Sequence, residues 1–413
     1  MQKRNDFMQK KLTVDKNRWY LLMIVAAILY VGYLFIYNVH WYGFHLGDAH
    51  WRWQECAYVL HRINPFKVMW EEVQPLESIG KLSAEGGTVP WAYVLGNLIN
   101  PGFLPYEIAR YYIIALNIVL PLLTWGLWAN YLLKKDYVQS KRTAFLYAAT
   151  IFAQTGWATG FQYGNQAGIV CCLIVLAMIA LDEHEILGAV LLAIAMCKPQ
   201  ITAVFFIPLL FKKKYKVIAI SAGIVVLSWW LASWLTGAPM IDLVLNMLGQ
   251  GLGYGDKYYY GLFNPLKYLG VSTSVILLLN IVVFGIVSLA IEFFRKKHGI
   301  DIDLFAYYAI FSLISVMWFY KQEHDYIVLA IAGVYLLCKS KNVIINTAFY
   351  IGEMMQMLYL VTWKLWFARF QSFKGLGVWG AFMVARFVEA MVLLLFIVYL
   401  FGCMNEKKKK VTG

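Results

Sequence analysis

The sequence predicts an all-α polytopic integral membrane protein. Of its 413 residues, 61% are hydrophobic and only 14% are charged, whereas soluble domains carry about 25% charged residues. The uncharged run 19–39 is long enough to cross the hydrocarbon core, which requires roughly 20 apolar residues in a helix. Further apolar runs follow it along the chain. Together they predict about 11 to 12 transmembrane or half-spanning helices.

The other predicted helices follow predominantly apolar runs. These runs are 111–133, 143–163, 164–181, 186–197 with 199–211, 217–241, 268–291, 304–320, 326–338, 342–363 and 375–403. The pair 186–197 and 199–211 is too short for two crossings, and Lys198-Pro199 interrupts it. Proline donates no amide hydrogen bond and disfavours helix at the residue before it. We therefore expect a broken hairpin whose tip lies inside or near the membrane.

The distribution of basic residues predicts the topology. Lys and Arg favour cytoplasmic loops. With the N-terminus inside, 23 of the 36 Lys and Arg residues lie in short loops and tails on the cytoplasmic side. The chain then divides into a cytoplasmic tail (1–18), one transmembrane domain (19–403) and a basic cytoplasmic tail (404–413). The net charge of +13 is read as a topology signal, so we expect membrane lipids and no nucleic acid as partners.

The first outer loop, residues 40–110, combines many reactive side chains. Within it, Asp48, Arg52 and Glu55 recur at positions i, i+4 and i+7, which places them on one face of a helix. Asn64-Pro65 is expected to end that helix. The loop therefore predicts a charged helical face just beyond the first membrane crossing.

The other side of the same helix is apolar. Trp51, Cys56, Tyr58 and Leu60 supply a surface that is expected to rest on the outer bilayer interface. The sequence thus predicts an amphipathic helix that lies on the outer face of the membrane.

Three interpretations of Asp48 remain open from its spacing. It follows Gly47 at the expected start of the helix, where an aspartate caps free amide groups. It also lies between His45 and His50, which suggests a metal site, although two histidines five residues apart do not share a helix face. The third interpretation is a general base that acts on a substrate hydroxyl at the membrane surface.

Four stretches resemble glycosyltransferase family 87, which belongs to the GT-C superfamily of multi-spanning transferases. The first is DAHWRWQECAYVLHRINPF (48–66), which is similar to the family's first outer-loop motif. The others are GFQYGNQAG (160–168), the Lys-Pro element within 188–216, and WFYKQEHDY (318–326). Their order along the chain agrees with the predicted topology.

The resemblance implies a reaction. Family members use a sugar on a polyprenyl phosphate, often mannose, and act at the extracellular or periplasmic face of the cell membrane. The acceptor would be a hydroxyl of a lipid- or polymer-linked glycan. A phosphate leaves as a stable anion, so one carboxylate suffices, and transfer inverts the anomeric configuration. We expect Asp48 to be the general base, with no cofactor and no metal.

The resemblance also implies roles for other residues. Arg52, Lys198 and Lys321 are expected to hold the donor phosphate, and His324 to act as a second catalytic residue. A lysine inside an apolar hairpin, such as Lys198, requires an anionic partner or water. The remaining expected substrate-binding residues are Glu55, Tyr163, Asn165, Gln166, Gln200, Tyr258 and Tyr259, of which the last two lie in a glycine-rich outer loop (242–267).

Three rival functions remain open. A transporter also carries buried charges and broken helices, although its polar site is expected near the midplane. A polysaccharide polymerase or ligase uses a sugar on a lipid diphosphate and is expected to carry a large late outer loop. A non-catalytic lipid- or glycan-binding scaffold would tolerate loss of Asp48.

Overall fold

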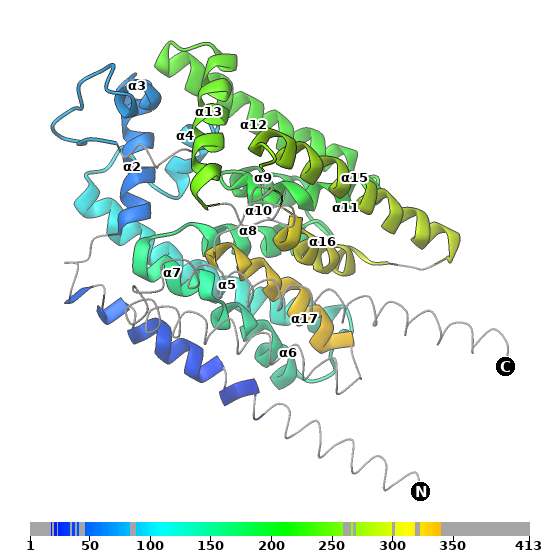
Figure 1. Cartoon of the computed structure of the whole chain (residues 1–413). Helices are drawn as coiled ribbons and strands as arrows, with labels where there is room; N and C mark the ends of the chain where they lie inside the picture. The colour runs from blue at the N-terminus through cyan, green and yellow to red at the C-terminus, as the bar shows by residue number, and fades with distance from the viewer. Residues whose placement is uncertain are drawn as a thin grey trace, which may run out of the picture.

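The described part of the chain is helical throughout. The computed structural model describes residues 18–40 (except 19, 23, 34 and 38), 46–82, 88–258, 266, 270–299, 302–318 and 323–339. Within these residues every regular element is an α- or 3₁₀-helix (Figure 1). The expected all-α polytopic membrane architecture is confirmed.

Four described helices are long and apolar enough to cross a membrane. They are Tyr20–Tyr37, α5 (Tyr106–Lys134), α12 (Tyr215–Thr236) and α15 (Thr273–Lys297). The 22 residues of α12 rise roughly 33 Å at 1.5 Å per residue, which matches a hydrocarbon core of about 30 Å. Two predicted spans, 342–363 and 375–403, lie outside the described residues, so the expected total of 11 to 12 helices stays a prediction.

Most of the other elements are shorter, and several predicted spans are broken into pieces. They are α2 (Gly47–Leu60), α3 (Pro65–Met69), α4 (Ala92–Leu95), η1 (Gly96–Leu98), α6 (Lys141–Ala148), η2 (Ala149–Ala153), α7 (Thr155–Tyr163), α8 (Ala167–Ala180), α9 (Glu185–Ala195), α10 (Pro199–Thr202), η3 (Ala203–Phe205), α11 (Phe206–Phe211), α13 (Met240–Tyr258), α16 (Leu304–Trp318), η4 (Glu323–Val328) and α17 (Leu329–Lys339).

Helix α8 lies at the centre of the packing. Its sequence, AGIVCCLIVLAMIA, is apolar on every side, and all but one of its side chains are buried. A helix that is hydrophobic all round must be enclosed by other elements. It packs against α5 and α9, and it also contacts η4 and α10. Helix α8 is therefore enclosed by elements from several parts of the chain.

The predicted break between 186–197 and 199–211 is confirmed. Helix α9 ends at Ala195, Lys198 adopts a non-helical backbone (φ −127°, ψ 75°), and Pro199 opens α10. Thr202 donates its hydroxyl to the Ala195 carbonyl at 2.7 Å, and the Trp91 indole donates to the Met196 carbonyl at 2.7 Å. These bonds satisfy carbonyl groups that the break leaves without an intrahelical partner.

The helix expected in the first outer loop is present, but its surroundings differ from the prediction. In α2, Cys56 and Tyr58 are buried against protein rather than resting on the bilayer. Tyr58 donates to the Gly80 carbonyl at 2.7 Å, and Cys56 lies beside α4. Cys56 and Tyr58 are covered because the rest of the same loop folds over them, whereas Leu60 is exposed.

The end of α2 also differs from the prediction. The helix stops at Leu60, four residues before Asn64, and Arg62 adopts a left-handed backbone (φ 61°). Asn64 instead begins the next helix, because its side chain accepts a hydrogen bond from the Phe66 amide at 3.0 Å. The Asn-Pro pair therefore starts α3 rather than ending α2.

A second apolar cluster joins α2 and α3 to the later helices α12 and α13. It includes Trp53 and Tyr58 of α2, Phe66 of α3, Ala232 of α12 and Leu243 of α13. Figure 1 shows α2, α3 and α13 gathered at one end of the molecule. The stretch 242–258 was expected to belong to a glycine-rich loop and is instead helical as part of α13. Its residues 243 and 247 contribute apolar packing, which stabilises a helix there despite the glycines.

The turn between α7 and α8 depends on Gly164. This residue ends α7 in a left-handed conformation (φ 73°) and packs directly against Leu46 and Ala49 at the start of α2. A Cβ atom there would strain the backbone and clash with the Cβ atoms of both neighbours. Gly164 thus sets how closely the first turn of α2 approaches the end of α7.

We expect Gly164→Ala to destabilise the protein by about 1–3 kcal/mol, the usual range for overpacking. Thermal denaturation of the detergent-purified protein measures the change. Gly126→Ala is the matched control, since a Cβ at Gly126 of α5 meets nothing within 4 Å. Equal melting temperatures for the two variants would contradict the close packing at Gly164.

Candidate active site

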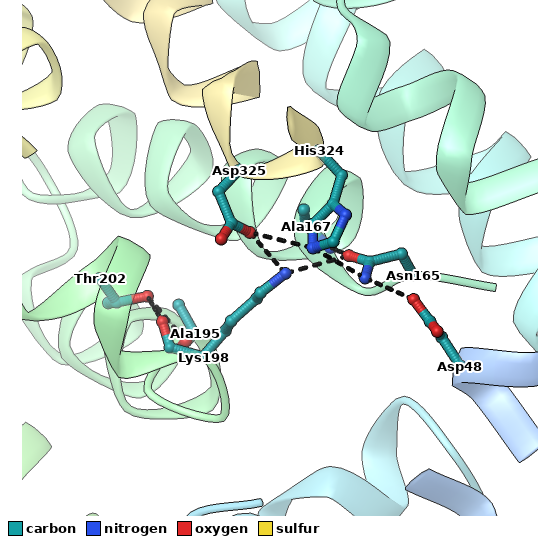
Figure 2. Close-up of polar contacts among 8 residues, drawn as sticks. All are labelled: Asp48, Asn165, Ala167, Ala195, Lys198, Thr202, His324 and Asp325. Atoms are coloured by element: carbon teal, nitrogen blue, oxygen red, sulfur yellow. Dashed lines mark hydrogen bonds and ion pairs between the residues drawn. The ribbon is translucent and has the colours of Figure 1, made fainter. Parts of the chain in front are cut away.

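Four segments distant in the sequence bring polar side chains together beside the start of α8 (Figure 2). Asp48 comes from the first turn of α2, Asn165 from the α7–α8 turn, and Lys198 from the break before α10. His324 and Asp325 come from η4. Asp48, Asn165, Lys198 and His324 were all expected to be site residues, and the structure brings them into one cluster.

Asp48 does not cap its helix. The residue preceding α2 is Leu46, and no side chain caps the helix start. The Asp48 carboxylate points instead at Asn165, whose Nδ2 donates to Asp48 Oδ2 at 2.8 Å. The capping interpretation is therefore wrong, because the helix begins one residue before Asp48 and the carboxylate is bonded across the molecule.

Asn165 is the centre of the cluster. Its Oδ1 accepts hydrogen bonds from Lys198 Nζ at 3.0 Å and from the Ala167 backbone amide at 2.9 Å. Its Nδ2 lies 2.8 Å from Asp48 Oδ2 and 3.0 Å from His324 Nε2. Figure 2 shows the amide lying between Asp48 on one side and the Lys198–Asp325 pair on the other.

Local sequence places this amide. Gly164 turns the chain at the end of α7, and Asn165 then bonds to the backbone two residues ahead, as asparagine does in turns. That bond satisfies one of the free amides at the start of α8. The turn and the site thus share one side chain.

Lys198 forms a buried ion pair. Its Nζ lies 2.5 Å from Asp325 Oδ1, and the two side chains are only 11% and 1% exposed. The ammonium does not reach outward from the hairpin tip, and the expected anionic partner is a carboxylate of the chain itself. A charge at this depth is stable only with such a partner.

His324 lies within the same network. It is buried, with Nε2 at 3.0 Å from Asn165 Nδ2 and 3.5 Å from Asp325 Oδ1. Asp325 itself was not among the expected site residues. Two signals pointed to it: a lysine in an apolar hairpin requires an anion, and an aspartate directly follows His324 in the polar stretch 318–326.

Arg52 and Glu55 pair with each other instead of joining this cluster. Arg52 lies 2.9 Å from Glu55 Oε2, and both side chains also bond the Thr88 hydroxyl. Glu55 is 1% exposed and accepts the Thr88 backbone amide at 3.1 Å. Burial raises the pKa of neighbouring Tyr93, and the charge of Glu55 adds to that effect. The pair holds residue 88 against α2.

The other expected site residues either neighbour the cluster residues along the sequence, lie elsewhere in the fold, or fall outside the described part of the chain. Gln166 is buried beside Asn165, and Gln200 is half-buried in α10. Tyr163 is exposed at the end of α7, and Tyr258 is the last residue of α13. Lys321, Tyr259 and His45 lie outside the described residues.

Of the three metal ligands considered for the first loop, His45 lies outside the described residues and Asp48 bonds to Asn165. The ring of His50 stacks on Trp53 at 5.7 Å between centroids and contacts Tyr106 at 4.4 Å. Its ring thus packs among aromatic side chains of α2 and α5.

Comparison with known protein families identifies the class of protein. The model of the family described as glycosyltransferase family 87 matches residues 94–338, which is more than half of the chain. The chain belongs to glycosyltransferase family 87. No curated protein and no solved structure gives a significant match to it.

Membership of glycosyltransferase family 87 makes this chain a glycosyltransferase. The matched range contains Asn165, Lys198, His324 and Asp325, and it ends at the C-terminal part of α17. It begins after α2, so Asp48 lies outside the matched range and contacts it through Asn165.

We expect Lys198→Met and Asp325→Leu each to destabilise the protein by about 3–5 kcal/mol, because each leaves one buried charge without its partner. The double variant should regain much of that stability. Thermal denaturation in detergent measures all three.

The exposed pair Lys134–Glu183 provides the control, since both side chains are more than half exposed. Lys134→Met should change the melting temperature little. A double variant no more stable than the single ones would contradict the mutual neutralisation of Lys198 and Asp325.

Proposed function

We propose that this chain transfers a monosaccharide, mannose or another hexose or pentose, from a polyprenyl-phosphate donor to a hydroxyl of a lipid- or polymer-linked glycan. The reaction takes place at the outer face of the membrane. The observation that carries the proposal is the contact of Asp48 with Asn165, which joins a carboxylate from the first loop to the Lys198 ammonium through one amide.

The reaction requires one base. The acceptor oxygen forms a bond to the anomeric carbon while the bond from that carbon to the donor phosphate breaks. Asp48 takes the acceptor proton, and the polyprenyl phosphate leaves as an anion with the bonding electrons. Attack opposite the leaving group inverts the anomeric centre. Hydrolases require a second carboxyl group to protonate a sugar leaving group, whereas a phosphate needs none.

Asp48 has the geometry of such a base. The carboxylate is half-buried, and its Oδ2 is held by Asn165. Its Oδ1 makes no hydrogen bond with the residues that the structure describes, so this oxygen is the one that would meet the acceptor hydroxyl. A positioned base contributes about 10²–10⁴-fold to a rate.

Lys198 is the cation best suited to the departing phosphate. An ammonium has three N–H donors, and two of them are directed at Asp325 and Asn165. The third has no partner within the described ranges and can donate to a phosphate oxygen. Arg52 is less suited because Glu55 and Thr88 already hold it. Lys321 remains part of the proposal on sequence grounds.

His324, Gln166 and Gln200 complete the proposed site. His324 adds an imidazole ring to the site, held beside Asn165 through Nε2. Gln166 follows Asn165 directly and Gln200 lies two residues after Lys198, so their amides are candidates for binding sugar hydroxyls. The family match argues for transfer rather than for transport or passive binding.

We expect Asp48→Asn to lower glycosyl transfer by at least 100-fold while leaving the amount of folded protein unchanged, because the amide keeps the shape of the side chain but accepts no proton. The assay is transfer of labelled mannose from polyprenyl phosphate mannose to extracted membrane glycolipids by the purified protein.

The matched control is Glu72→Gln, which neutralises an exposed carboxylate of the same loop and should leave the rate unchanged. Transfer by Asp48→Asn at the rate of the unaltered protein would exclude Asp48 as the base. Absence of transfer by the unaltered protein, tested also with polyprenyl phosphate glucose and arabinose donors, would refute the donor class.

A further inference from the structure

The orientation of the Asn165 amide is determined by its surroundings. Its oxygen faces two groups that only donate, the Lys198 ammonium and the Ala167 backbone N–H. A flipped amide would direct its own N–H groups at these two donors. The oxygen must therefore face Lys198, and both hydrogens of Nδ2 face Asp48 and His324.

This orientation has a consequence for Asp48. Two strong donors fix the amide plane, so Nδ2 presents a hydrogen to Asp48 Oδ2 at a set position. The bond holds the carboxylate in one rotamer and leaves Oδ1 to the acceptor. A base misplaced by about 1 Å can lose 10²-fold in rate, so the position of this side chain matters as much as its chemistry.

The amide also separates Asp48 from the Lys198 ammonium. Its oxygen contacts Lys198 and its nitrogen contacts Asp48, while Asp325 balances the ammonium. Asp48 is therefore held by a neutral donor rather than by a direct ion pair with Lys198.

The same amide sets the role of His324. Because Nδ2 of Asn165 is a donor, His324 Nε2 at 3.0 Å is the acceptor, which requires an unprotonated nitrogen at that position. One side chain therefore orients a carboxylate and selects the tautomer of an imidazole.

We propose that Asn165 is a positioning residue that sets the rotamer of Asp48, and that Lys198 and the Ala167 amide hold it in its working orientation. This inference rests on the proposed role of Asp48 as the base. Asn165 touches the base and does not itself exchange a proton with the substrate.

The first test is Asn165→Asp. Two carboxyl groups at hydrogen-bond distance share a proton, which raises the pKa of one of them. The pH–rate profile of mannose transfer should therefore shift its acidic limb upward by about one pH unit or more. Asn246→Asp, on half-buried Asn246 of α13, introduces the same charge away from the cluster and should leave the limb in place.

The second test is Asn165→Ala. Loss of the bond to Asp48 should lower kcat by about 10- to 100-fold. KM for polyprenyl phosphate mannose should stay within about threefold, because Asp325 still holds Lys198. A merely structural role would lower the yield of folded protein and leave kcat per folded molecule and the pH limb unchanged.

The outcomes separate the two proposals. Full activity of Asp48→Asn refutes the base assignment and the inference with it. An inactive Asp48→Asn with an unshifted pH limb in Asn165→Asp refutes the positioning role alone. A rise in KM for the donor without a fall in kcat in Asn165→Ala also refutes it, since Asn165 would then act in binding.

Discussion

The buried ion pair between Lys198 and Asp325 is the constraint on which the arrangement of the site depends. An ammonium in an apolar helical hairpin is stable only beside an anion, and the carboxylate that meets it comes from a segment more than a hundred residues later. This requirement brings η4 to the break between α9 and α10. His324, adjacent to Asp325, enters the cluster with it.

Breaks in helices make the site possible. Lys198 reaches the cluster because α9 ends before Pro199, and Asn165 reaches it because Gly164 reverses the chain after α7. In a continuous helix the backbone N–H and C=O groups bond to one another, so only side chains would be available to form the site. Interrupted helices bring side chains and backbone amides such as that of Ala167 to the same point. Each interruption removes helical hydrogen bonds, and local bonds replace part of them, including the bond from the Thr202 hydroxyl to the Ala195 carbonyl.

The loop between Tyr20–Tyr37 and α5 is a folded unit that positions Asp48. Its α2 is buried on one side by its own loop, tied to residue 88 through Glu55, and packed against α7 at Gly164. The charged face expected from helical spacing therefore divides in two. Asp48, at the helix start, faces the cluster, whereas Arg52 and Glu55, a turn or two further on, hold the loop together.

The sequence by itself determined the class of fold, the helical character of the spans, and the break at Lys198-Pro199. These features follow from composition, from the length of apolar runs and from the chemistry of proline, which are all local. It also indicated Asp48, Asn165, Lys198 and His324. Only the tertiary structure decided which of these groups touch. Asn165 bonds Asp48 across 117 residues and His324 across 159, and helical periodicity states which residues share a face but not which faces meet. Contacts between elements that are distant in the sequence decide the partner of Lys198, the hydrogen bonds that direct the Asn165 amide and the burial of α2.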